Sequence, residues 1–295
     1  MINTKIERIR DPFVVVEEDA YYMYGTGVVT DWEETGWVCY KNTSGKLDGA
    51  WTKLETPFYI KPEGAKTNFW APEVHKYKGA YYMFATYFSS ITNHRGCSIL
   101  KSETPEGPFV EITNGHATPK DWDAIDGTFY VDEEGLPWMV FVHEWTCTDD
   151  GIGRMSVAKL SDDLTHFISE PVDLFRADAP SWSNHRVTDG CFMYKTKDNQ
   201  LLMIWSNIED AGGYCVGIAR SKNGKVDGEW VQEDELLYSK AISGKHDGGH
   251  GMIFYDKDDK MYLAIHAPNR PCAECEETAV FVPIFEENGT LKNNL

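Results

Sequence analysis

The sequence predicts an all-β fold, a five-bladed β-propeller with four-stranded antiparallel blades. Two observations support this prediction. Short runs of β-branched and aromatic residues, bounded by Gly, Asp, Asn and Pro, fill the chain, and no stretch of about 12 residues keeps a helical apolar period. One pattern also occurs five times at intervals of roughly 60 residues: a polar head residue, an apolar run, a turn and a second apolar run. Such a period indicates a propeller with one repeat per blade.

Each repeat begins at a head residue, which in the first unit is Asp11, just before the apolar run 13–16. The five heads are Asp11, Glu73, Asp126, Asp189 and His250. Because the first strand of a propeller blade faces the central channel, residues at equivalent positions form a ring around the axis. We therefore expect the five heads to converge at one depth in the channel.

The strands follow in order within each unit. The first two units predict strands at 13–16, 21–26, 37–40 and 51–54, then at 71–74, 81–86, 97–100 and 109–112. The third and fourth units predict strands at 125–129, 138–142, 155–158 and 167–168, then at 188–192, 201–205, 215–219 and 230–231. The fifth unit predicts 249–253, 261–265 and 278–282 but shows no fourth strand. We hypothesise that segment 5–9 supplies this strand and closes the ring.

No linker or change in composition separates the units. We therefore predict one catalytic domain, 1–295, with blades at about 9–55, 70–112, 124–175, 187–233 and 246–285. The loops between the blades carry the irregular sequence, and loops on one face of a rigid scaffold usually build the functional site.

The composition argues against several partners. The formal net charge of −19 opposes binding to nucleic acid or to an anionic membrane but does not oppose an uncharged substrate. No apolar run approaches the roughly 18 residues of a membrane span, and residues 1–5 have no apolar signal core. The seven cysteines are scattered and odd in number, which favours a reducing compartment. These features predict a cytoplasmic protein, unless a leader has been removed.

Four carboxylates near one axis would repel one another and lose hydration, and both effects raise the pKa of some of them. A single carboxylate at a strand start more often caps a turn, but four in phase favour a site that binds a cation or performs chemistry. Glycoside hydrolysis uses two carboxyl groups, one as acid and the other as base or nucleophile. Because the Gly-x-Ser-x-Gly, P-loop and His-Glu-x-x-His motifs are absent, glycoside hydrolysis is the favoured chemistry.

Four motifs carry a resemblance to a known family: Arg10-Asp11-Pro12, Trp70-Ala71-Pro72-Glu73, the run 125–135 that begins Ile125-Asp126-Gly127, and Gly249-His250-Gly251. The chain resembles glycoside hydrolase family 43, the five-bladed arabinosidases and xylosidases, from about residue 9 to 285. The resemblance implies an inverting mechanism in which Asp11 is the general base that activates water. It also implies that Asp126 orients the general acid and raises its pKa, and that His250 lies near the axis, where relatives hold a cation or a water.

The general acid is the point at which the chain departs from the family pattern. The family shows Glu-Gly-Pro in the fourth unit, whereas this chain has Asp189-Gly190-Cys191. Asp is one methylene shorter, so on an unchanged backbone its carboxyl would lie back by roughly 1 Å, which can reduce a rate about 100-fold. Three accounts stay open: Asp189 is the acid after a backbone shift, Glu144 serves instead, or catalysis is lost.

The candidates for substrate binding are Trp70, Glu73, His143, Trp145 and Arg186. Trp70 comes three residues before the head Glu73 and should stand at the channel mouth. His143 and Trp145 flank Glu144 at a strand end. Arg186 lies three residues before Asp189 and is expected to bind a sugar hydroxyl, with a surface cation as an equal alternative. Three further tryptophans occur in loops, where packing and sugar stacking are equally expected: Trp32, Trp122 and Trp182.

The resulting prediction is a hydrolase that releases an α-L-arabinofuranosyl or β-D-xylosyl unit from plant-type oligosaccharides. Two alternatives stand beside it, a non-catalytic sugar-binding propeller and a galactosidase or other glycosidase on the same scaffold. No cofactor is expected to be required, and the resemblance allows a structural Ca²⁺ or Na⁺ on the axis near His250. The expected partner is the oligosaccharide substrate, and the sequence predicts no oligomeric state.

Overall fold

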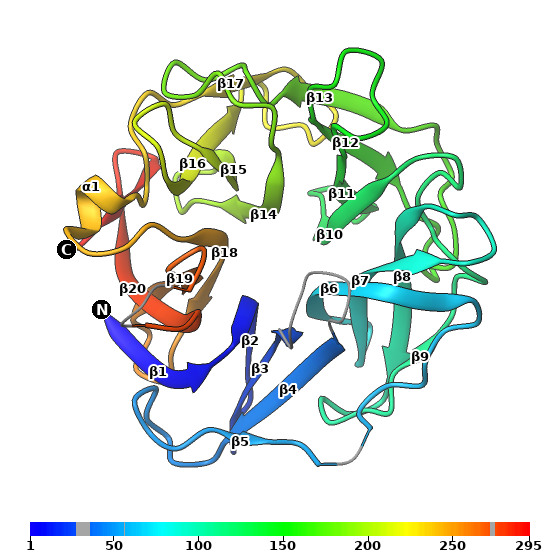
Figure 1. Cartoon of the computed structure of the whole chain (residues 1–295), viewed down its shortest axis with the longest axis horizontal. Helices are drawn as coiled ribbons and strands as arrows, with labels where there is room; N and C mark the ends of the chain where they lie inside the picture. The colour runs from blue at the N-terminus through cyan, green and yellow to red at the C-terminus, as the bar shows by residue number, and fades with distance from the viewer. Residues whose placement is uncertain (28–35, 56, 272–274) are drawn as a thin grey trace.

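The computed structural model describes residues 1–27, 36–55, 57–271 and 275–295. Five antiparallel sheets surround a central axis, with the first strand of each sheet next to the axis and the later strands toward the rim (Figure 1). This arrangement confirms the predicted five-bladed β-propeller. The only helix in these ranges is α1 (Lys240–Ser243), in the connection before the last blade. No helix in the described ranges has the length and apolar character needed to cross a membrane.

Strands within each of the first four blades pair in chain order. Blades one and two consist of β2 (Ile9–Val16), β3 (Tyr21–Gly27), β4 (Gly36–Asn42) and β5 (Thr52–Lys53), then β6 (Ala65–Tyr77), β7 (Ala80–Ser89), β8 (Arg95–Ser102) and β9 (Val110–Glu111). Blades three and four consist of β10 (Ala124–Val131), β11 (Pro137–His143), β12 (Arg154–Lys159) and β13 (Val172–Arg176), then β14 (Asp189–Lys195), β15 (Leu201–Ile208), β16 (Tyr214–Ser221) and β17 (Trp230–Gln232).

The fifth blade joins both ends of the chain. It consists of β18 (Gly249–Tyr255), β19 (Met261–Ala267), β20 (Thr278–Glu287) and β1 (Ile2–Glu7), and β21 (Thr290–Asn293) pairs with the far end of β20. β1 runs antiparallel to β20, and both termini lie beside this blade (Figure 1). The hypothesis that an N-terminal segment closes the ring is therefore confirmed, with the strand at Ile2–Glu7 instead of 5–9. Closure covers the edge of β20 that would otherwise be exposed.

The outer strand of the third blade lies further along the chain than the sequence predicts. Its fourth strand is β13 (Val172–Arg176), and the expected segment 167–168 forms only an isolated bridge between Phe167 and Leu160. The Phe167 ring stacks on Phe141, with 5.8 Å between centroids. The apolar character of this segment therefore reflects a loop side chain that packs against the core, whereas the side chains of β13 are exposed or half-buried.

Every innermost strand contains a β-bulge at the same structural position. In blade one the register passes from Arg10 opposite Thr26 to Phe13 opposite Tyr24, so β2 holds one residue more than β3 over this interval. The same step occurs in the other four blades. The residue after the first pair has a left-handed backbone in each: Asp11 (φ 52), Ala71 (φ 42), Asp126 (φ 55), Gly190 (φ 49) and His250 (φ 51). We call these five the bulge residues.

The positions of the bulges show that the five heads are not all equivalent, contrary to the prediction from the sequence. Asp11, Asp126 and His250 occupy equivalent positions, but Glu73 lies two residues beyond its bulge residue and Asp189 lies one residue before its own. The repeat matched residues by polar character, whereas backbone position depends on where the extra residue is inserted. Consequently the carboxyl groups of the repeat do not lie in one plane.

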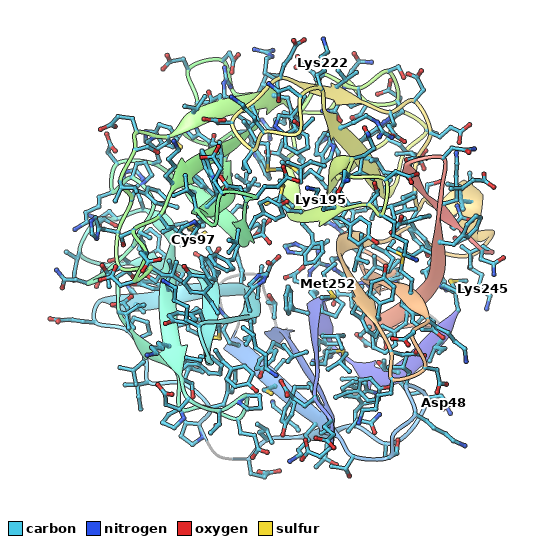
Figure 2. All side chains as sticks on the ribbon, turned by 180° about the vertical axis from the view of Figure 1, so that it is seen from behind. Asp48, Cys97, Lys195, Lys222, Lys245 and Met252 are labelled. Carbon is cyan, nitrogen blue, oxygen red and sulfur yellow. The ribbon has the colours of Figure 1, made fainter. Side chains whose placement is uncertain are left out.

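Apolar side chains fill the space between neighbouring blades. Separate clusters join blades two and three, three and four, and four and five, and a larger one spans blades five, one and two. Beneath the bulge residues, the register aligns a second layer of residues: Phe13, Glu73, Thr128, Phe192 and Met252. Seen from behind, Met252 lies near the centre of the ring and Lys222 and Lys245 lie at the rim (Figure 2). This packed layer forms the floor below the bulge residues.

Candidate active site

A cavity of about 260 Å³ opens above this floor, and all five blades contribute to it. Its lining consists of Arg10, Asp11, Trp70, Ile125, Asp126, Glu144, Trp145, Val187, Asp189, Ile208, Tyr214, His250, Asn269 and Arg270. The cavity brings together the four predicted catalytic carboxyl groups, both predicted sugar-binding tryptophans and His250. A concave site with convergent polar groups is the usual form of a small-molecule site.

Asp11 is held as an ionised carboxylate. Its Oδ2 accepts a hydrogen bond from Thr26 Oγ1 at 2.6 Å, and its Oδ1 lies 3.3 Å from His250 Nδ1. Burial by itself raises the pKa of Asp11, but the charges of His250 and Arg10 and the Thr26 hydrogen bond outweigh burial and lower that pKa below 3.8. Asp11 is therefore ready to accept a proton at neutral pH.

The backbone of Asp11 is fixed by His266. The Asp11 N–H donates to His266 Nδ1 at 3.2 Å, which requires that this nitrogen carry no proton. Burial, followed by the charge of Arg10, holds the pKa of His266 well below 6.5, so the ring is neutral at neutral pH. The contact between these residues is thus a hydrogen bond to a neutral imidazole and not an ion pair.

Asp126 occupies the equivalent position in the third blade but titrates differently. Burial is the main cause that raises the pKa of Asp126 to about 6, and the nearby Asp11 carboxylate adds to it. His250 Nδ1 lies 3.7 Å from Asp126 Oδ2, and the Gly190 N–H donates to the same oxygen at 3.0 Å. Asp126 therefore exchanges its proton near neutral pH.

The surroundings of Asp189 favour its protonated form. Burial raises the pKa of Asp189 well above 3.8, and the neighbouring Asp126 raises it further. The Tyr214 hydroxyl donates to Asp189 Oδ2 at 3.1 Å, which leaves Oδ1 as the oxygen that carries the proton. Asp189 is therefore a proton donor that faces the same cavity as the ionised Asp11.

Glu144 has a different partner from the other three carboxyl groups. Its Oε2 accepts a hydrogen bond from Arg95 Nε at 2.8 Å, and Arg95 also pairs with Asp123 at 3.2 Å. Burial raises the pKa of Glu144, and the Arg95 guanidinium opposes that rise. The guanidinium also lies over the Trp70 ring, 5.8 Å from its centroid. Glu144 thus holds Arg95 against a wall of the cavity.

His250 supplies the positive charge at the centre of the site. Burial disfavours its charged form, but the carboxylates of Asp11 and Asp126 outweigh burial and raise the pKa of His250. Its side chain therefore acts as a counter-ion to both residues. Within the described ranges no group of three or more His, Cys, Asp or Glu residues could hold a metal ion, so the Ca²⁺ or Na⁺ near His250 stays a prediction.

Three predicted substrate-binding residues lie outside the cavity lining. Glu73 sits in the layer beneath, where its Oε2 is 2.9 Å from His75 Nε2. His143 stacks against Trp122 with 3.7 Å between centroids, because it points to the opposite side of the blade from Glu144. Arg186 is exposed, and its carbonyl accepts the N–H of Gly153. The structure therefore does not bring these three residues into the cavity with the others, and their binding of substrate stays a prediction.

The structure shows the surroundings of two of the three tryptophans that were expected in loops. Trp122 packs on His143, and Trp182 packs on Trp205 with 5.5 Å between centroids while its Nε1 donates to the Glu233 carbonyl. Both are therefore packing residues. Trp32 lies outside the described residues.

Several cavity residues were not predicted from the sequence, among them Tyr214, Asn269 and Arg270. Tyr214 begins β16, and the other two follow β19, so each lies at a blade end that faces the cavity. The only available signal was their place beside a strand end, which many surface residues share. Arg10 was visible in its motif, and the structure shows it in a buried ion pair with Glu277 at 2.8 Å.

The cysteines divide into two groups. Five are free, and four of these are buried: Cys39, Cys97, Cys147, Cys191 and Cys215. Cys275 is disulfide-bonded, and Cys272 lies outside the described residues. None of the six described cysteines except Cys275 carries a disulfide, and none lines the cavity.

Comparisons with known proteins agree with the fold. Endo-arabinase from Bacteroides thetaiotaomicron VPI-5482 superposes with a TM-score of 0.83 at 35% identity and covers 98% of each chain. An extracellular exo-α-(1→5)-L-arabinofuranosidase of Cellvibrio japonicus is 26% identical over 169 residues, which are 53% of this chain and 45% of that protein. A probable arabinan endo-1,5-α-L-arabinosidase C of Aspergillus niger is 26% identical over 278 residues, 82% of this chain and 78% of that protein.

The chain spans less than half of the length of the Cellvibrio relative. The family pattern is far more extensive, since it matches residues 5–290. With the five-bladed architecture and the clustered carboxyl groups, this match shows that the chain belongs to glycosyl hydrolases family 43.

Proposed function

We propose that the protein is an inverting glycoside hydrolase that cleaves α-1,5-linked L-arabinofuranosyl units from arabinan-type oligosaccharides. One observation carries the proposal: two carboxyl groups line the same cavity and their pKa values are shifted in opposite directions, so that Asp11 favours the ionised state and Asp189 the protonated state. An acid and a base of this kind are what single-displacement hydrolysis requires.

The reaction follows from these two states. Asp11 accepts a proton from a water molecule as the water oxygen forms a bond to the anomeric carbon. The bond between that carbon and the leaving oxygen breaks, its electron pair goes to the oxygen, and Asp189 gives that oxygen its proton. Proton exchange with solvent then restores both residues. His250 stabilises the negative charge that appears on Asp189, because it already neutralises the neighbouring carboxylates.

We assign the general acid to Asp189 and not to Glu144. Asp189 accepts a hydrogen bond from the neutral Tyr214 hydroxyl, whereas Glu144 forms a charge-assisted hydrogen bond with Arg95. An acid must hold its proton until the leaving group needs it, and a guanidinium at 2.8 Å favours the ionised form. Glu144 instead positions Arg95 over Trp70.

Four observations support an arabinofuranosyl substrate. The endo-arabinase that shares 35% identity and the curated relatives are named for arabinan or arabinofuranoside cleavage. A cavity of about 260 Å³ is small among ligand pockets, which favours one or two sugar rings at the reacting centre. Trp70 and Trp145 give the cavity apolar faces for a sugar ring. An uncharged sugar also suits a protein with a net charge of −19.

The test is to incubate the purified protein with α-1,5-arabino-oligosaccharides and follow the products by proton NMR. We expect hydrolysis with the β anomer appearing first, before mutarotation. The α anomer first would contradict inversion. Binding by calorimetry without turnover would support a sugar-binding propeller, and faster turnover of nitrophenyl β-D-xyloside or galactoside would replace the arabinofuranosyl assignment.

A further inference from the structure

The bulge residues are linked by hydrogen bonds across the junctions between blades. At four junctions, the N–H of a bulge residue donates to a side chain near the end of the second strand of the preceding blade. The four pairs are Asp11 to His266 Nδ1 (3.2 Å), Ala71 to Thr26 Oγ1 (2.8 Å), Asp126 to Thr86 Oγ1 (3.0 Å) and His250 to Ser206 Oγ (2.8 Å). Each acceptor residue pairs across the sheet with the residue that precedes the bulge residue of the acceptor's own blade. The four acceptors therefore occupy equivalent positions.

The junction between blades three and four is the exception. Val142 occupies the acceptor position, because it pairs with Ile125 as Thr26 pairs with Arg10. Val142 is fully buried and its side chain has no polar atom. The Gly190 N–H, which would otherwise meet a hydroxyl here, donates to Asp126 Oδ2 at 3.0 Å.

The first blade shows what a hydroxyl at this position does. Thr26 Oγ1 lies between the Asp11 carboxylate, at 2.6 Å, and the Ala71 N–H, at 2.8 Å. Asp11 is therefore separated from the next blade by one hydroxyl group. In the third blade the hydroxyl is missing, and the carboxylate of Asp126 contacts the next blade directly. The two aspartates have the same backbone geometry but different carboxyl partners.

We infer that Val142 is a positioning residue: by offering no acceptor to the Gly190 N–H, it directs that N–H to Asp126 and holds the Asp126 carboxyl against blade four, beside Asp189. The inference rests on the proposed function, in which Asp189 is the acid. It also explains how one repeated position serves as base in blade one and as neighbour of the acid in blade three.

The electrostatic surroundings of Asp126 come from every blade. The titratable groups that act on it or respond to it are His250, Asp11, Glu73, Asp189, Glu144, Tyr214, Cys97 and Cys191. Asp126 raises the pKa of Asp189 more than any other charged neighbour. Moving the Asp126 carboxyl away by the width of a hydroxyl group should therefore lower the pKa of Asp189.

The test is Val142→Thr, which keeps the branched shape and adds one hydroxyl. We expect this hydroxyl to accept the Gly190 N–H and to move the Asp126 carboxyl away from Asp189. The alkaline limb of the kcat/KM profile should then shift to lower pH by about half a unit, and kcat should fall about tenfold. Val157→Thr, a buried valine of β12 in the same blade, controls for burying a hydroxyl.

A packing role for Val142 makes a different prediction. Val142→Ala should lower the melting temperature and leave the pH profile in place, because alanine offers no acceptor either. A Val142→Thr profile that coincides with those of wild type and Val157→Thr would overturn the inference. Carboxyl ¹³C NMR titration of Asp126 and Asp189 in Val142→Thr needs no substrate. Unchanged titrations would overturn the inference, and shifted titrations in a protein that cleaves no arabinoside would uphold it while removing the proposed function.

Discussion

His250 Nδ1 lies 3.3 Å from Asp11 Oδ1, and both side chains are only 10% exposed. The proximity raises the pKa of His250 and lowers that of Asp11, so each residue favours the charged form of the other. The same imidazole lies 3.7 Å from Asp126. A single cation therefore sets the charge state of two carboxyl groups whose proposed roles differ.

Replacing His250 with Asn should move the acid limb of the pH profile upward. The folded pKa of Asp11 is depressed, and it rises when the positive neighbour is removed. The base then becomes protonated at higher pH, so kcat/KM falls earlier as pH is lowered. Asn tolerates the left-handed backbone at this position. An acid limb identical to that of wild type would show that His250 does not control Asp11.

Asp11→Asn should reduce hydrolysis by about 10²- to 10⁴-fold while the protein stays folded, because the amide cannot accept the proton of the attacking water. Asn again suits the left-handed backbone, and it can still accept from Thr26. Activity is measured on arabino-oligosaccharides and folding by circular dichroism. Retention of most of the activity in a folded variant would remove Asp11 as the base.

The proposed acid is tested by the leaving group. Asp189→Asn should cleave a natural oligosaccharide poorly but lose much less on a nitrophenyl arabinofuranoside, since a good leaving group needs little protonation. Glu144→Gln is the matched comparison, because it removes the charge that holds Arg95. We expect Glu144→Gln to lose similar factors on both substrates. The reverse pattern would assign the acid to Glu144.

The buried acids should make the fold less stable as pH rises. The folded pKa of Asp126 is raised to about 6 from an ordinary value near 3.8. Its contribution to stability is thus complete below pH 3.8 and is lost as pH rises through about 6. Asp126→Asn should therefore reduce the loss of unfolding free energy between pH 4 and 7 by about 2 kcal/mol, as measured by urea denaturation. Asp19→Asn, in an exposed turn, should follow wild type. An Asp126→Asn curve parallel to wild type would contradict the assignment.

Ring closure should depend on the Arg10–Glu277 pair. The side chains are 7% and 4% exposed, and Arg10 also bonds to Asn269. Glu277→Ala leaves a buried guanidinium without its carboxylate, so the unfolding free energy should fall by about 3–5 kcal/mol. Glu103→Ala, at a more exposed ion pair with Lys101, should change it little. Equal effects of the two substitutions would show that the buried pair adds nothing to closure.

Much of the architecture could be predicted because its signals are local. The apolar pattern of a strand is a property of consecutive residues, and its fivefold recurrence implies one blade per repeat. The motifs around Asp11, Asp126 and His250 also placed these residues correctly at the cavity. The predicted depth of Glu73 in the channel was wrong because Glu73 lies two residues beyond its bulge residue. The pattern of polar residues does not show where a strand inserts an extra residue.

The amino-acid sequence by itself determined the five-bladed fold, the family and the group of carboxyl residues available for chemistry. Only the tertiary structure decided which of them has a lowered pKa and which has a raised pKa. The reason is that burial and charge act through space between blades: His250 lowers the pKa of Asp11, Asp126 raises that of Asp189, and Arg95 pairs with Glu144. The two partners in each of these pairs belong to different blades, so they meet only in the folded propeller.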